Sequence, residues 1–224
     1  MKQNKMGFKI RCSAIGQIMT DARTKGQLSK TTQSYCESWL KEKIYGKRKE
    51  FTSKYTDKGI LEEDANIEFA NKMLGITSIK NEEYFENDFL TGTPDIILEN
   101  EIIDVKSSWD CFTFPIFDTE INKDYFYQLQ GYMELTGKRK ARLVYVLGDT
   151  PVSILHSEAN KLKYSLGYDF EEALEIVKKK HDYSHVLDDL RIKVFDVVYD
   201  AEIIEKIKQR VKECEIYTNN LIRL

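Results

Sequence analysis

Hydrophobic residues in the first third of the chain recur every three to four positions, which is the spacing of amphipathic helices. A short helix is expected from Ser13, which would cap the first turn with its hydroxyl, to about Thr20. Longer helices are expected at about 31–45 and 57–74, because each segment is followed by a glycine that suits a left-handed helix end.

The helical spacing of hydrophobic residues ends in the middle of the chain. Apolar and β-branched residues there form continuous runs of strand length. Residues 94–98 and 101–106 flank the polar pair Glu99-Asn100 and are expected to form a hairpin around that two-residue turn. Further strands are expected at 76–80, 83–87, 141–147 and 191–199, and further helices at about 121–136, 169–181 and 201–218. Helices flanking a small mixed sheet predict an α/β or α+β fold.

One domain is the expected organisation for residues 1–224, because the chain has no repeat, no low-complexity tract and no Pro- or Gly-rich linker. The sequence divides this domain into a basic helical part at 1–58 and a core at 59–149. An insertion at 150–187, whose role the pattern does not indicate, precedes a terminal strand and helix at 188–224.

Composition excludes several classes of protein. A hydrophobic content of 42% and a charged content of 32% argue against long disorder. No apolar run approaches the ~18 residues of a membrane span, and the N-terminal residues lack the hydrophobic core of a signal peptide. The 4 cysteines are scattered without a CxxC pair, which argues against a zinc ribbon. These features predict a cytoplasmic protein that does not use a membrane.

The net charge of −3 conceals an asymmetry along the chain. Residues 1–58 carry 14 Lys and Arg against 5 Asp and Glu, whereas residues 59–224 carry 20 against 32. A basic quarter on an acidic body suggests one surface that faces a polyanion such as DNA. A solvated lysine-rich helix face is the alternative, and charge alone does not separate the two.

The predicted hairpin places two carboxylates opposite each other. With Glu99-Asn100 as the turn, the register pairs Asp95 with Asp104, and their Cβ atoms would be about 5 Å apart. Side chains alternate along a strand, so Lys106 lies on the same face as both acids. Like charges so placed are destabilising unless a cation or a proton lies between them. Mg²⁺ typically takes one or two carboxylates together with waters and phosphate oxygens. The alternative is a hairpin end with solvated charges.

These residues resemble a known nuclease signature. Pro94-Asp95 followed by Asp104-Val105-Lys106 is similar to the PD-(D/E)xK motif of metal-dependent nucleases, with DxK in place of the more frequent ExK. The resemblance implies a restriction-endonuclease-like core and Mg²⁺, for which Mn²⁺ can substitute. Asp95, Asp104 and the Val105 carbonyl would hold the metal, and Lys106 would orient or deprotonate the attacking water.

The helix expected at 57–74 resembles the GxxxE element of the exonuclease branch, whose glutamate completes the metal site. The spacing of GxxxE, counted from Gly59, selects Glu63, which we prefer. The ExxAxxxF pattern of some relatives, counted back from Ala65 and Phe69, selects Glu62 instead. An acid-rich helix N-terminus, favoured by the helix dipole, is the alternative explanation for either residue.

Two further segments narrow the resemblance to the lambda-exonuclease-like and YqaJ-like viral recombinases. Gln128 and Tyr132 are similar to a QxxxY element, and their i, i+4 spacing places them on one helix face. Arg11 and Ser13 lie in a segment similar to the one in which a serine holds the DNA 5′-phosphate. Core packing and a plain helix cap are the respective alternatives. The basic residues Lys47, Arg48 and Lys49 could follow the DNA backbone.

The resemblance implies an exonuclease that digests linear double-stranded DNA from its ends, 5′ to 3′, in phage-type recombination. Its expected partners are double-stranded DNA ends and a single-strand annealing protein, and a ring-shaped homo-oligomer is common in this branch. The alternatives are an endonuclease of the same superfamily and a catalytically silent DNA-binding module.

Overall fold

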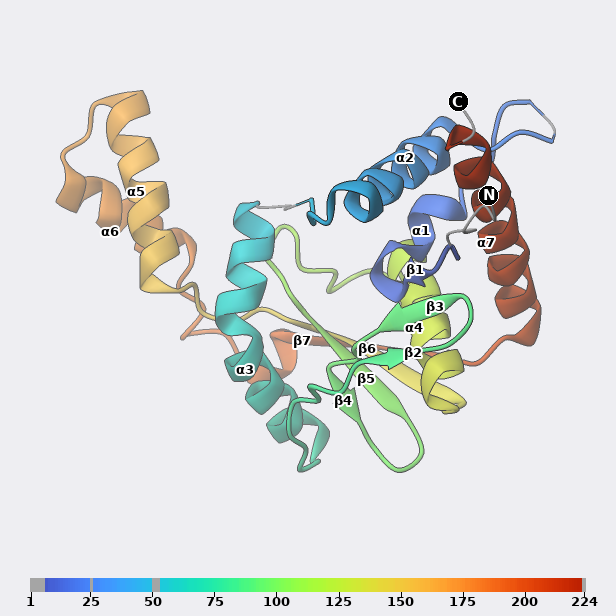
Figure 1. Cartoon of the computed structure of the whole chain (residues 1–224). Helices are drawn as coiled ribbons and strands as arrows, with labels where there is room; N and C mark the ends of the chain where they lie inside the picture. Colours follow the sequence, from blue (N-terminus) through green and yellow to red (C-terminus); the bar gives the residue numbers. More distant parts are fainter. Residues whose placement is uncertain (1–6, 25, 50–52, 223–224) are drawn as a thin grey trace.

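The computed structural model describes residues 7–24, 26–49 and 53–222 (Figure 1). Residues 1–6 of the stretch considered for a signal peptide, and residues 25 and 50–52 of the basic part, lie outside the described residues. The first half of the chain forms β1 (Ile10–Arg11), the 3-10 turn η1 (Cys12–Ala14), α1 (Ile15–Ile18), α2 (Lys30–Tyr45), α3 (Lys54–Leu74), β2 (Phe85–Glu86), β3 (Leu90–Gly92) and β4 (Ile96–Ile97). The second half forms β5 (Ile102–Ser107), α4 (Lys123–Thr136), β6 (Lys140–Val146), α5 (Val152–Leu166), α6 (Phe170–Lys180), the 3-10 turn η2 (Asp188–Leu190), β7 (Ile192–Val198) and α7 (Ala201–Leu221).

The strands form two small mixed sheets. The larger sheet has the order β4-β5-β6-β7, with β5 and β6 parallel and the other neighbours antiparallel. The smaller sheet has the order β1-β3-β2, with β1 parallel to β3. Helices flanking small mixed sheets confirm the predicted fold class.

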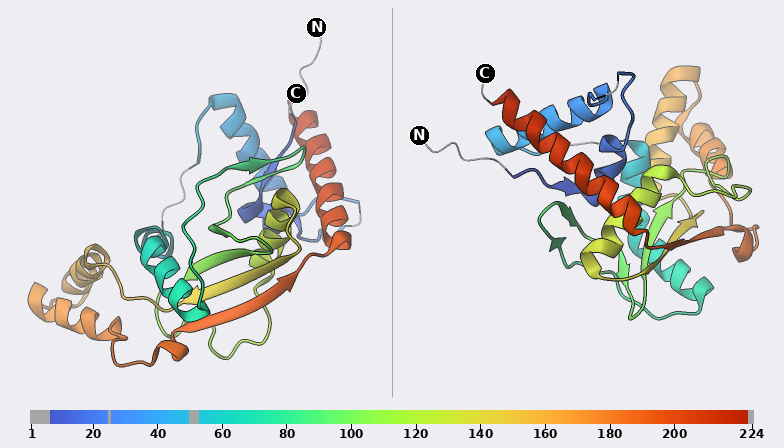
Figure 2. Two further views of the ribbon diagram at one scale, coloured as in Figure 1. Left: turned by 90° about the horizontal axis from the view of Figure 1, so that it is seen from below. Right: turned by 90° about the vertical axis from the view of Figure 1, so that its right-hand side faces the viewer.

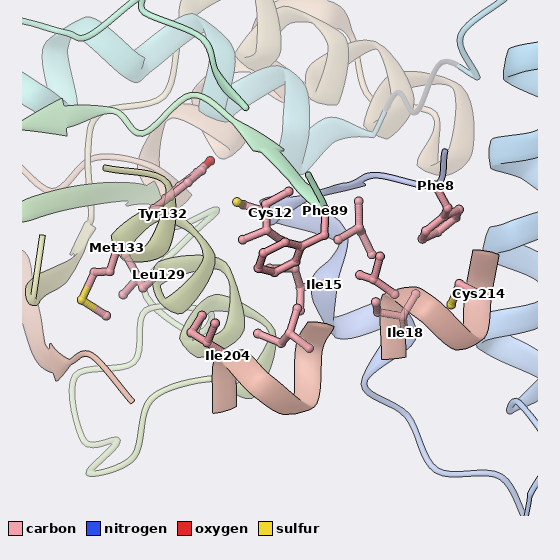
Figure 3. Packing of buried hydrophobic residues seen from close by; sticks show 14 of the residues in the cluster. Phe8, Cys12, Ile15, Ile18, Phe89, Leu129, Tyr132, Met133, Ile204 and Cys214 are labelled. Atoms are coloured by element: carbon pink, nitrogen blue, oxygen red, sulfur yellow. The ribbon is translucent and has the colours of Figure 1, made fainter. Parts of the chain in front are cut away.

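Helices cover both faces of the larger sheet. α3 packs on one face through a core that includes Ile67, Ile103 and Val144. α4 packs on the other face, where Leu129 and Met133 meet Ile102 and Leu143. The N-terminal segment and α7 extend this second core, so Cys12 and Ile15 lie against α4, with Ile204 of α7 nearby (Figure 3).

The helix pair α5 and α6 projects from this body. The two helices pack mainly on each other around a small core of Ala159, Ala173, Leu174 and Val177. Figure 2 shows them at the end of the molecule away from α7. Within the described ranges, no helix is both long and apolar enough to cross a membrane.

The predicted helices that end at a glycine are confirmed. Gly46, Gly75 and Gly137 each follow a helix with a φ of 62° to 72°, which is the left-handed region that glycine tolerates. α3 begins three residues earlier than expected, because the Ser53 side chain accepts a hydrogen bond from the Thr56 amide.

Other expectations about local structure were wrong. Ser13 does not cap a helix, because the chain first turns through η1 and neither η1 nor α1 has a side-chain cap. Residues 76–80 form no strand, since Asn71 at the end of α3 donates a hydrogen bond of 2.8 Å to the Ser78 carbonyl. β1, β3 and α5 were not expected, and α5 accounts for much of the stretch at 150–187.

Candidate active site

The hairpin of β4 and β5 has the register expected from the sequence. Ile96 pairs with Ile103 and Ile97 with Ile102, and the Leu98 amide donates a 2.8 Å hydrogen bond to the Glu101 carbonyl at the turn. Asp95 and Asp104 are therefore the next positions outward from these pairs. The alternation along β5 places Asp104 on the α4 side of the sheet, as Ile102 is.

Asp95 is held at the end of β4 by the backbone of the neighbouring strand. Its Oδ2 accepts a hydrogen bond of 2.7 Å from the Val105 amide. Burial raises the pKa of the Asp95 carboxyl, and the nearby charge of Asp104 raises it further. The Asp104 charge therefore adds, across the hairpin, to the cost of ionising the buried Asp95 carboxyl.

Lys106 places a positive charge next to the acid pair. Its Nζ lies 2.7 Å from Asp104 Oδ2, and Asp104 itself is only 1% exposed. Burial acts to lower the pKa of Lys106, but the charges of Asp104 and Asp95 outweigh it and raise that pKa. The same ammonium lies 5.0 Å from the ring centre of Tyr125, a cation–π contact that fixes its position further.

Gln128 and Tyr132 of α4 complete the surroundings of Asp104. Gln128 Nε2 donates to Asp104 Oδ1 at 3.0 Å and to the Tyr132 hydroxyl at 3.1 Å. Burial raises the pKa of the Tyr132 phenol, with the Asp104 charge as a further cause, so the hydroxyl stays protonated. The expected shared face of these two side chains thus points at the acid pair.

Two glycines allow α4 to approach this closely. A Cβ atom at Gly92 would lie 2.6 Å from the Tyr132 ring, and one at Gly131 would lie 2.8 Å from Cys12 Sγ. These distances are shorter than side chains tolerate, so Gly92 and Gly131 are required for the position of Tyr132 beside the site.

The two glutamates of α3 have different environments. Glu63 lies at the edge of the site, where its Oε2 forms an ion pair of 2.8 Å with Lys80 and its charge contributes to the raised pKa of Asp95. Glu62 is 4% exposed and points toward β5, where its Oε2 accepts a 2.6 Å hydrogen bond from Ser107. Glu63 is therefore the glutamate whose charge acts on Asp95.

Lys58 is a buried cation that sequence reasoning missed. Its side chain is 1% exposed, and its Nζ donates to the carbonyls of Ser108 at 3.0 Å and Trp109 at 3.1 Å. The same Nζ lies 3.7 Å from Glu62 Oε2 on the same helix, and its bonds to the two carbonyls tie α3 to the segment that follows β5. Its i, i+4 spacing from Glu62 was the available signal, but such pairs usually lie on exposed helix faces.

The acid pair suits a hard divalent cation. Asp104 Oδ2 is buried and its contact is the Lys106 ammonium at 2.7 Å, so the second lone pair of this oxygen is available to a metal ion. Mg²⁺ commonly takes one or two protein carboxylates and fills its other positions with waters and substrate oxygens. Among the described residues, no three His, Cys, Asp or Glu side chains are grouped to hold a metal. The donors present therefore fit an ion that is coordinated partly by its substrate.

A basic groove leads away from Tyr132. It has a volume of about 780 Å³, and its lining includes Tyr132, Arg11, Ser13, Lys47 and Arg48. The fold thus brings together four of the residues that the sequence assigned to DNA.

The carboxylate of Glu42 makes two contacts in this groove. Arg11 forms an ion pair of 2.7 Å with Glu42, and the Lys49 amide donates to the same carboxylate at 3.1 Å. Lys49 lies in an adjoining groove that Arg11 and Ser13 also line. A bound phosphate would therefore compete with Glu42 for Arg11.

Comparison with solved structures gives a consistent picture, although the chain matches no family model and no curated protein. It is similar to a phage-related exonuclease from Haemophilus somnus, with 29% identity and a TM-score of 0.80 over 97% of this chain and 96% of that one. An alkaline exonuclease, LHK-Exo from Laribacter hongkongensis, has the same fold at 16% identity, with a TM-score of 0.66 over 98% and 93%. The same enzyme in complex with dAMP gives a TM-score of 0.65 at 16% identity, over 96% and 92%. These neighbours confirm the resemblance that the motifs indicated.

Proposed function

We propose that the chain is a Mg²⁺-dependent exonuclease that digests linear double-stranded DNA from its ends. The observation that carries this proposal is the pair Asp95 and Asp104 beside Lys106, in a fold shared with exonucleases over nearly its whole length. The dAMP bound to LHK-Exo supports a nucleotide as the product, because cleavage from an end releases mononucleotides.

The roles of the site residues follow from their contacts. Asp95 and Asp104 would hold Mg²⁺ with the Val105 carbonyl as a further donor. Glu63, which is paired with Lys80 and is not grouped with the two aspartates in the structure, would have to turn away from Lys80 to join them. The ion would supply positive charge to the phosphodiester under attack. Gln128 would keep the Asp104 carboxylate in place through its 3.0 Å hydrogen bond, and Tyr132 would fix Gln128 in turn.

Lys106 would act on the attacking water. In the structure the charges of Asp104 and Asp95 raise the pKa of Lys106 and keep the side chain charged. With both acids on Mg²⁺ that cause would weaken, so Lys106 would either orient the water by a hydrogen bond or deprotonate it. In-line displacement at phosphorus by this water breaks the bond to the leaving oxygen and yields a 5′-phosphate on the product.

The basic groove supports a 5′ to 3′ direction. A 5′-phosphate bound by Arg11 and Ser13 would hold the strand end at one side of the groove, with Tyr132 at the site side. Lys47 and Arg48 in the same groove, with Lys49 in the adjoining one, would neutralise backbone phosphates.

A role in phage-type recombination follows from the likeness to a phage-related exonuclease. In that role a single-strand annealing protein would take up the strand that digestion exposes. A ring of several copies around the duplex would keep the enzyme on its substrate.

Digestion of linear and covalently closed circular duplex, each with Mg²⁺, Mn²⁺ or EDTA, tests the proposal. Linear DNA should be degraded to mononucleotides with either metal, and closed circles should stay intact. Cutting of circles as fast as linear DNA would replace the proposal with an endonuclease. Binding of DNA without cleavage under any of these conditions would indicate a silent module.

A further inference from the structure

The segment that joins β5 to α4, residues 108–122, carries the most exposed large hydrophobic side chains in the described part of the chain. Phe112 is 93% exposed and Phe117 is 90% exposed. The segment begins two residues after Lys106. An exposed phenylalanine forgoes the roughly 1.5–3 kcal/mol that burial of its ring would contribute, and two such rings on one short segment cost twice that.

The backbone around Phe112 is fixed, so its exposure does not come from a loose loop. Asp110 Oδ1 accepts hydrogen bonds from the amides of Phe112 at 3.1 Å and Thr113 at 2.9 Å. The preceding Cys111 amide donates to the Tyr183 hydroxyl at 3.0 Å. Phe114, two residues later, is buried, so the chain inserts one ring into the core and presents the other outward.

Phe117 is held in a similar way. The Asp118 amide donates to the Pro115 carbonyl at 3.1 Å, which closes a turn with Phe117 inside it. Lys193 Nζ donates to the Ile116 carbonyl at 3.4 Å and ties this turn to β7. Both rings are therefore presented by ordered backbone.

The loop is continuous with the candidate active site. Figure 1 shows it crossing between α3 and α1 below α2. Ile116 packs in the same cluster as Tyr145. The Tyr145 ring meets Tyr125 edge-to-face at 5.9 Å, and Lys106 Nζ lies 5.0 Å from the centre of the Tyr125 ring. The turn that carries Phe117 is thus two rings away from the catalytic lysine.

The charges of the loop indicate which part of DNA it would meet. Its charged side chains beside the two rings are Asp110, Asp118 and Glu120, which repel phosphates. Aromatic rings instead stack on base faces, and stacking tolerates any base sequence. Bases offer a free face where they are unpaired, at a frayed end or on a single strand.

We propose that Phe112 and Phe117 stack on unpaired bases of the DNA strand next to the site. This inference rests on the proposed function, because it requires a nucleic-acid strand beside Lys106. The basic groove would hold the phosphates, and the loop would hold bases that have left the duplex.

Binding in EDTA, where no cleavage interferes, tests the inference. Two fluorescein-labelled strands of equal length serve as probes, one with bases and one made of abasic sites, so that only bases distinguish them. The full chain should bind the strand with bases more tightly. Phe112→Ala with Phe117→Ala should raise the Kd for that strand about tenfold and leave the Kd for the abasic strand unchanged.

Two further variants separate stacking from other effects. Phe112→Leu with Phe117→Leu keeps apolar side chains. This double variant should still lose most of the difference in Kd between the strand with bases and the abasic strand. Tyr164→Ala removes a ring that is 82% exposed on α5 and should behave as wild type on both strands. All variants should melt at the wild-type temperature, because the replaced side chains are exposed.

Several results would overturn the inference. If the Phe112 and Phe117 double variant binds both strands as wild type does, the rings do not contact DNA and are free to dock a protein. If both strands are weakened equally, the loop contacts phosphates. If the wild type degrades linear duplex but shows no preference for bases, only the stacking fails. If the wild type neither binds nor degrades DNA, the proposed function fails with it.

Discussion

Gln128 and Asp104 are joined by a hydrogen bond of 3.0 Å between Nε2 and Oδ1, although they lie on a helix and a strand that are 24 residues apart. Both side chains are buried, at 5% and 1% exposure. The amide therefore fixes one oxygen of the buried carboxylate, while the other oxygen faces Lys106.

Gln128→Leu should reduce cleavage of linear DNA at least about tenfold, because Asp104 Oδ1 would lose its donor and the carboxylate could rotate. The unpaired oxygen should also lower the free energy of unfolding by about 1–3 kcal/mol. Gln130→Leu is the matched control, since Gln130 is equally buried on the same helix but bonds to Val198 and Asp200. That variant should lose stability and keep its activity per folded molecule. Equal activity losses in both would contradict a specific role for Gln128.

Asp95 predicts how the stability of the metal-free protein depends on pH. Its pKa is raised from 3.8 to about 7 in the folded state. At pH values between these two, the folded protein therefore binds more protons than the unfolded chain. The free energy of unfolding should therefore decrease as pH rises from about 4 to 7. Asp95→Asn should remove that decrease and be more stable than wild type at pH 8. Urea denaturation of both proteins at pH 4, 6 and 8 in EDTA measures this pH dependence.

Millimolar Mg²⁺ provides the control for this experiment. It should raise the stability of the wild type at pH 8 by mass action on the folded state and leave Asp95→Asn nearly unaffected. A wild type with constant stability between pH 4 and 8 would show that folding does not raise the pKa of Asp95.

Lys58→Met should lower the free energy of unfolding by about 3–5 kcal/mol, because Glu62 would remain buried without its cation. Adding Glu62→Gln should restore part of this loss, since the uncompensated charge is then removed. Lys54→Met, one turn earlier on α3, is the control and should have little effect because Lys54 is 38% exposed. Denaturant melts of the wild type, Lys58→Met, Glu62→Gln, the double variant and Lys54→Met measure these differences. Additive losses in the double variant would show that Lys58 and Glu62 are not coupled.

Lys106→Ala should abolish cleavage and leave the Kd for duplex DNA within a few-fold of wild type. Replacing Lys47, Arg48 and Lys49 together by alanine should instead weaken binding. The slope of log Kd against log salt should fall by about 2–3, because each lost phosphate contact removes about 0.9. Titrations in EDTA at several salt concentrations measure both effects. An unchanged slope would mean that these three side chains do not face DNA.

End recognition gives the last prediction. Removing the 5′-phosphate from linear duplex should slow digestion at least about tenfold, which corresponds to ~1.4 kcal/mol. Arg11→Ala with Ser13→Ala should digest both substrates at the slower rate. Glu42→Gln should keep the preference for phosphorylated ends, because it leaves Arg11 without its carboxylate partner. Equal rates on both ends with the wild type would remove the physical support for a 5′ to 3′ direction.

Much of the larger sheet and its helices could be predicted from the sequence because the signals are local. A glycine after a helix and a two-residue polar turn between β-branched runs act within a few residues, and both were interpreted correctly. The position of Asp95 next to Asp104 followed from the period of the strand alone. α5 escaped prediction because Pro151, the residue before it, provides no side-chain cap, and because the helix packs mainly on α6.

The rest of the site depends on contacts between distant segments. Lys58 is buried by the carbonyls of Ser108, Trp109 and Gly148, which lie at least 50 residues away in sequence. The salt bridge of Arg11 with Glu42 likewise joins β1 to α2. No periodicity marks such contacts, so they required the folded structure.

The parallel pairing of β1 with β3 has a consequence for synthesis on the ribosome. Ile10 can pair with Leu90 only after the segment between them has been made, and Cys12 meets Gly131 later still. The N-terminal segment must therefore wait in an unpaired state during translation, with Ile10 and Ile15 exposed to other chains. Chaperones that hold nascent apolar segments would act on this stretch before α4 emerges and covers it.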